Sequence, residues 1–121
     1  MIPDARSALA ALIEAAGVRC VDYIPERITP PIAIMEPSSD WISSGEAYGE
    51  WRIGFDVTLV TQTAANTTAT TVLDGMLEDV LLEVNDTANF YCSTVSAPTA
   101  LSANNAEYLS VALTIYQITR L

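Results

Sequence analysis

The chain contains no lysine and no histidine, and its fifteen carboxylates outnumber five arginines to give a formal net charge of −10. Without imidazole, it lacks the usual general base near neutral pH and the commonest metal ligand of proteins. Without a lysine amine, Schiff-base catalysis is excluded. Five scattered arginines in an acidic chain do not make the basic patch that neutralises nucleic-acid phosphates. These absences favour a protein that binds other proteins.

Other signatures of chemistry are also missing from the sequence. The five glycines form no glycine-rich phosphate loop. Two cysteines cannot supply a zinc cluster, and no run of spaced acids resembles a calcium loop. Cys20 and Cys92 lie in apolar, strand-like patterns, which predict buried free thiols and not nucleophiles. We therefore expect no catalytic residue, no metal and no cofactor.

Length and composition predict one domain over residues 1–121, because half of the residues are hydrophobic and can form one core. The N-terminal stretch lacks the features of a signal peptide, and no apolar run is long enough to span a bilayer. We expect synthesis in a cytoplasm, with reduced thiols and no membrane partner. The acidic surplus fits either simple like-charge repulsion between molecules or a surface that nucleic acid passes without binding.

Hydrophobic periodicity predicts two helices and several strands. Apolar residues recur at helical spacing over 4–16 and over 72–84, and acids lie opposite the second stripe. The strands predicted from alternating or short apolar patterns are 18–23, 32–36, 50–62, 90–97 and 107–119. Two helices can cover one face of a mainly antiparallel sheet. We therefore predict an α+β two-layer sandwich with a four- to five-stranded sheet.

A long loop is predicted at 38–49, where serine and glycine are frequent but Trp41, Ile42 and Tyr48 also occur. Loops of this length inside compact domains usually serve a function. The apolar side chains either fold back onto the protein's own core or dock on another subunit, because Trp and Tyr are enriched at interfaces. Together with Trp51, they form the candidate protein-contact loop.

Two predicted strands are candidates for sheet edges that pair with another subunit. Prolines frame the strand at 32–36, and proline is confined to edges because it lacks a backbone donor. The final strand at 107–119 is the second candidate. An open edge offers unpaired backbone N–H and C=O groups to a partner strand. Assembly is expected to rest on apolar contacts and strand pairing, since no lysine is available for ion pairs between subunits.

Four short motifs follow one another along nearly the whole chain. They are YIPERITPPIAIMEP (23–37), GEW (49–51) at the start of a long alternating strand, LDGML (73–77) in an acidic helix and VSAP (95–98) before the final strand. A loop bearing Ser, Trp and Tyr lies between the first two. In this order the motifs resemble the tail terminator (tail-completion) proteins of long-tailed phages that infect actinobacteria.

The resemblance implies a small α+β subunit that forms a ring, typically of six copies, at the head-proximal end of the tail tube. Such a ring ends tube polymerisation, joins the tail to the head connector and lets DNA pass, and it is not an enzyme. The implied partners are further copies of this chain, the tail-tube protein and a head–tail connector or adaptor protein. The implied location is the virion, after synthesis in the host cytoplasm.

Two alternatives remain open on the sequence. The first is a neighbouring structural role, either as a head-completion adaptor or as a tail-tube subunit. The second is a small hydrolase or ligand-binding domain that uses carboxylates, since fifteen acids make some close pair inevitable by chance. The second alternative requires two acids with raised pKa values in a pocket.

Overall fold

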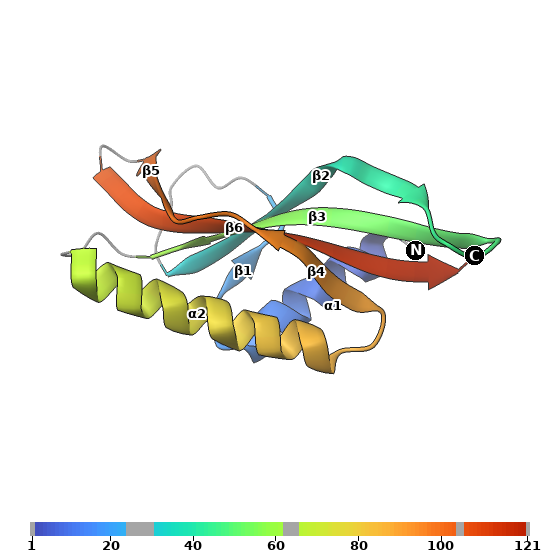
Figure 1. Cartoon of the computed structure of the whole chain (residues 1–121), viewed down its shortest axis with the longest axis horizontal. Helices are drawn as coiled ribbons and strands as arrows, with labels where there is room; N and C mark the ends of the chain where they lie inside the picture. Colours follow the sequence, from blue (N-terminus) through green and yellow to red (C-terminus); the bar gives the residue numbers. More distant parts are fainter. Residues whose placement is uncertain (1, 24–30, 62–65, 104–105, 121) are drawn as a thin grey trace.

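A computed structural model describes residues 2–23, 31–61, 66–103 and 106–120 (Figure 1). Within these ranges two helices pack on one side of a six-stranded sheet, which confirms the predicted α+β class. The elements in chain order are α1 (Ile2–Ala15), β1 (Cys20–Val21), β2 (Ile32–Ser44), β3 (Glu50–Val60), α2 (Asn66–Asp86), β4 (Phe90–Val95), β5 (Thr99–Ala103) and β6 (Ala106–Arg120). The sixth strand is β5, a short strand after Pro98 that the sequence patterns did not predict.

The strand order is β1-β2-β3-β6-β4, and β5 also pairs with β6. β1 is parallel to β2, and the other pairings are antiparallel. β3 pairs with β6 from Ser110 to Arg120, while β4 and β5 share the opposite side of β6. The prediction of an open edge at 107–119 is therefore wrong. The alternation of apolar and polar residues in that segment shows which side chains point to each face of the sheet. It does not show which strands pair with the segment on either side.

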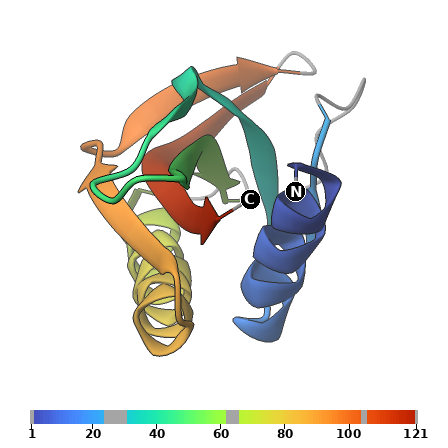
Figure 2. The ribbon, with the colours of Figure 1, turned by 90° about the vertical axis from the view of Figure 1, so that its right-hand side faces the viewer.

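The main core lies between the sheet and the two helices, which both lie below the curved sheet in Figure 2. Each of these elements contributes side chains that are at most 1% exposed. The largest of them are Leu9 and Ile13 of α1, Met35 of β2, Leu73 of α2, Ile53, Phe55 and Leu59 of β3, and Leu113 and Ile115 of β6. Burying one such side chain contributes about 1.5–3 kcal/mol relative to leaving it exposed.

The two helices follow the predicted stripes with small differences at their ends. α1 begins at Ile2, so Asp4 lies in its first turn and does not precede it as a cap. Gly17 has φ +91° just past the helix, in the left-handed region that favours glycine. Along α2, Leu73, Val80 and Val84 are buried, but Val72 is 46% exposed and lies outside the buried stripe.

The segment predicted as a long loop is mostly strand. β2 continues through Ser44 and forms an antiparallel hairpin with β3, so only 45–49 form the connection. The register shifts between Pro37 and Ile42, where four residues of β2 lie opposite the single residue Gly54. Such a bulge breaks the alternating pattern from which a strand is normally recognised.

Candidate protein-interaction site

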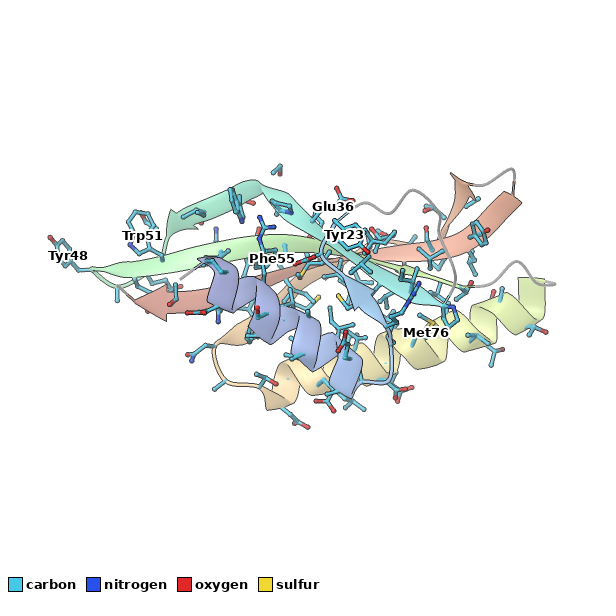
Figure 3. All side chains as sticks on the ribbon, turned by 180° about the vertical axis from the view of Figure 1, so that it is seen from behind. Tyr23, Glu36, Tyr48, Trp51, Phe55 and Met76 are labelled. Atoms are coloured by element: carbon cyan, nitrogen blue, oxygen red, sulfur yellow. The ribbon has the colours of Figure 1, made fainter. Side chains whose placement is uncertain are left out.

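The β2–β3 hairpin projects past the ends of both helices (Figures 1 and 3). Its connection is held by short backbone hydrogen bonds: Gly45 N–H donates to the Glu50 carbonyl at 2.8 Å, and Glu50 N–H donates to the Ala47 carbonyl at 3.1 Å. The Glu50 carboxylate also accepts the Glu46 N–H at 3.1 Å. Gly49 supplies a φ of +78°, which a larger side chain would disfavour. The projecting turn is therefore ordered by its own contacts.

The four side chains of the candidate protein-contact loop occupy different environments. Tyr48 lies at the turn and is fully exposed (Figure 3). Ile42 is 38% exposed on β2, and Trp51 is half-buried on β3. Trp41 is different: it packs against the main core, and Arg6 of α1 lies 5.6 Å from its ring centroid. The hairpin thus brings Ile42, Tyr48 and Trp51 to one projecting element, whereas Trp41 serves the core.

A polar cluster crosses four strands at the base of this hairpin. The Tyr116 hydroxyl donates to Asp40 Oδ1 at 3.1 Å, and Arg52 Nη2 lies 3.7 Å from Asp40 Oδ2. Arg52 Nη1 also donates to the Tyr91 hydroxyl at 3.3 Å. The guanidinium carbon lies 4.5 Å from the Tyr116 ring centroid, and the two tyrosine rings are 5.4 Å apart. The cluster therefore joins β2, β3, β4 and β6.

This cluster lies on the sheet face opposite the helices. Ile53 and Ile115 point into the main core, so their neighbours Arg52 and Tyr116 point the other way. Burial and the neighbouring Asp40 carboxylate raise the pKa of Tyr116, and the nearby Arg52 charge partly opposes that rise. The phenol therefore stays neutral near pH 7 and acts as a hydrogen-bond donor that fixes the hairpin to the sheet.

Sequence reasoning missed this cluster. Its members come from strands that are distant in the chain, and the Asp40–Tyr116 contact spans 76 positions. The available signal was the alternation of β3, which placed Arg52 on the polar side of that strand. No local pattern indicates which tyrosine or carboxylate meets it there.

A hollow of about 270 Å³ lies between the polar cluster and the turn of the hairpin. Its lining residues are Ser44, Gly45, Glu46, Glu50, Arg52, Tyr91 and Ile118. Small-molecule pockets usually measure about 300–1,000 Å³. The hollow is slightly smaller than that range, and it mixes an apolar side chain with charges of both signs. Its size suits a side chain of a partner protein.

The two cysteines are free and half-buried, and both pack against the main core, as their apolar surroundings predict. Burial raises the pKa of Cys20 to about 11, and the carboxylates of Glu14 and Asp22 add to the rise. Burial also raises the pKa of Cys92, although a backbone hydrogen bond with Thr94 partly opposes the rise. A raised pKa keeps a thiol protonated, and the thiolate is the nucleophile. Both residues therefore serve packing.

Over the described ranges, no group of three Cys, Asp or Glu side chains is placed to hold a metal ion. The same part of the chain has no helix long and apolar enough to cross a membrane. No protein-family model matches the chain, and no curated protein matches its sequence.

Proposed function

We propose that the chain is a structural virion protein of the phage tail terminator type. It would form a ring at the head-proximal end of the tail tube, end tube polymerisation and join the tail to the head connector. The sequence motifs at 23–37, 49–51, 73–77 and 95–98 support this role. The α+β fold is compatible with it, but fold alone does not determine function.

The observation that carries the proposal is the projecting β2–β3 hairpin with Tyr48 fully exposed at its turn. Tyrosine is enriched among the side chains that dominate binding energy at protein interfaces. The Asp40–Arg52–Tyr116 contacts hold the hairpin base in place, so little conformational entropy is lost when the turn docks. We assign the hairpin to the contact with the tail tube or the head connector.

The sheet edges support ring formation. β1 pairs only with Ala33 and Ile34 of β2, and the rest of that edge, 35–44, has no strand neighbour in the described structure. β4 and β5 form the opposite edge. Two different edges permit head-to-tail contacts, and such contacts close into a ring when the rotation between copies allows it. Of the two edges predicted from sequence, the one at 32–36 is covered by β1 at Ala33 and Ile34, and the proposal uses the remaining edge of β2.

The net charge of −10 supports passage of DNA through such a ring without specific binding. Phosphates are repelled by carboxylates, and tight DNA binding depends on their neutralisation by Lys and Arg. In this proposal the carboxylates face solvent or the channel. Their concentration in contacts between subunits would contradict that part of the proposal.

The proposal is tested by the mass of the purified protein, alone and with tail-tube subunits, using light scattering and native mass spectrometry. We expect a closed ring of about six copies, alone or on the tube, as the resemblance implies. A protein that stays monomeric and also fails to bind tube subunits would contradict the proposal.

Electron microscopy of particles lacking the protein separates the neighbouring roles. Loss of a terminator gives tails of abnormal, unregulated length. Loss of a head-completion adaptor gives tails of normal length that are detached from heads, and loss of a tube subunit gives no tube. Only the first outcome agrees with the proposed role.

A further inference from the structure

A second surface, far from the hairpin turn, lies on α2. A shallow hollow of about 280 Å³ is lined by Asp74, Leu77, Glu78, Leu81, Leu82 and Asn85. Leu77 and Leu81 are half-buried and pack against the main core, so they form a fixed apolar floor. Leu82 is 56% exposed and extends the apolar surface of the hollow towards solvent. The exposed carboxylates of Asp74 and Glu78 border this apolar surface.

The charge of α2 has one sign only. The helix contains five of the fifteen acids of the chain (Asp74, Glu78, Asp79, Glu83 and Asp86) and no arginine or lysine. Asp74 and Glu78 lie four positions apart on the helix, and like charges at this spacing repel each other. A cationic partner would relieve this repulsion.

We infer that this surface of α2 docks a basic amphipathic segment of another protein. Its apolar side chains would cover Leu77, Leu81 and Leu82, and its Lys or Arg side chains would pair with Asp74 and Glu78. A second copy of this chain does not fit the same face, because each copy would contribute five carboxylates and no cation. The volume suits one or two aliphatic side chains and is slightly below that of typical ligand pockets. This inference holds whether or not the chain forms a ring.

The test uses the full chain and two synthetic helical peptides of equal length. One peptide carries Leu on one face and Lys on the other, and the second has Glu in place of every Lys. Binding is measured by fluorescence anisotropy, and the bound surface is mapped by amide chemical shifts in NMR. We expect only the Leu/Lys peptide to bind, with shifts concentrated between Asp74 and Asn85. Equal binding of the Leu/Glu peptide, or shifts elsewhere on the molecule, would overturn the inference.

Matched variants separate docking from general attraction between opposite charges. Leu82→Ser is expected to weaken binding of the Leu/Lys peptide by about tenfold, because an aliphatic contact is lost. Val72→Ser alters another exposed apolar residue of α2, outside the hollow, and should leave binding unchanged. Likewise, Asp74→Asn with Glu78→Gln should weaken binding more than Asp79→Asn with Asp86→Asn, although both pairs remove two charges. Equal losses within either comparison would contradict a defined docking site.

Light scattering of the protein without peptide tests whether a second copy of this chain binds the α2 surface. We expect no self-association that depends on Leu82. A dimer that the parent chain forms and Leu82→Ser abolishes would identify a second copy as the partner and would overturn the assignment to a basic segment.

Discussion

The Tyr116 ring lies so close to Gly54 that a β-carbon on Gly54 would come within 2.6 Å of Tyr116 Cε1. The same β-carbon would lie 3.2 Å from the β-carbon of Ser38. β3 lies between β6 and β2, so the Tyr116 side chain must pass over β3 to reach Asp40. Gly54 leaves the space for this crossing. One missing side chain therefore makes the polar cluster possible.

Gly54→Ala is expected to destabilise the fold by about 1–3 kcal/mol, the usual cost of an extra carbon in a filled site. Urea denaturation followed by circular dichroism measures the change. Gly75→Ala is the matched control, because its added β-carbon would meet no atom within 4 Å beyond the adjacent residues and backbone of α2 itself. That control should gain up to about 1 kcal/mol from the better helix propensity of alanine. Equal stability of Gly54→Ala and the parent would show that the close approach is not required.

Tyr116→Phe is expected to lower the free energy of unfolding by about 0.5–1.5 kcal/mol, because it removes the hydrogen bond to Asp40. Asp40 is about half exposed, so water can replace part of the lost interaction. A double-mutant cycle with Asp40→Asn isolates the coupling between the two side chains. Tyr108→Phe, in the same strand but outside the cluster, serves as the control. Additive effects of the two single changes would contradict a direct Tyr116–Asp40 interaction.

The raised pKa of Tyr116 predicts a loss of stability in alkaline solution. The folded state holds the phenol proton more tightly than the unfolded state. The contribution is therefore fully present below the ordinary tyrosine pKa of about 10, and it is lost as pH rises through the folded pKa. Chemical denaturation across this alkaline range should show a smaller decline for Tyr116→Phe than for the parent. Parallel curves for the two proteins would exclude the predicted shift.

Cys20 is expected to react slowly with iodoacetamide at pH 8. A rise in its pKa from 9.0 to about 11 reduces the thiolate fraction by about 100-fold. The labelling rate is measured by mass spectrometry against pH in a Cys92→Ser background, which leaves one thiol. The native protein should give a midpoint near 11, and the urea-unfolded protein a midpoint near 9. A native midpoint near 9 would show that burial and the neighbouring carboxylates do not act on this thiol.

If the proposed terminator role is right, Tyr48→Ser weakens binding to the tail-tube or connector protein by at least about tenfold, while stability changes by less than about 0.5 kcal/mol. The small stability effect follows from full exposure of the side chain. Tyr23→Ser removes another exposed tyrosine, 61% exposed and distant from the hairpin turn, and should leave binding unchanged. Surface-immobilised tube or connector protein provides the assay. Equal binding by both variants and the parent would remove the hairpin turn from the interface.

The sequence was sufficient to predict those helices and strands in which one buried face gives a regular spacing of apolar residues. Alternation over 50–62 predicted β3, whose Ile53, Phe55, Val57 and Leu59 all reach the core. Helical spacing likewise predicted α1 and most of α2. In each case one face of the element is buried along its length, so the pattern depends only on local geometry.

The hairpin and its polar cluster could not be predicted in the same way. β2 loses its alternation at the bulge, and its polar residues near Asp40 are held by Tyr116 and Arg52 from other strands. The segment therefore looked like a loop, although tertiary contacts make it a strand. Trp41 shows the same limit, since its pattern could not distinguish a core position from a surface one. The proposed docking surface on α2 was also not predicted, because helical periodicity does not show that Leu82 lines a hollow with Leu77 and Leu81.

The central place of β6 has a consequence for how the molecule is made. β3, β4 and β5 all precede β6 in the chain, and each pairs with it. While the nascent chain is still on the ribosome, β4 and β5 must wait for the strand they pair with. The β3–β6 pairing joins segments far apart in the sequence and is also slow to form. Folding of the sheet is therefore a late and cooperative event. The apolar surfaces of both helices stay partly exposed until the sheet is complete.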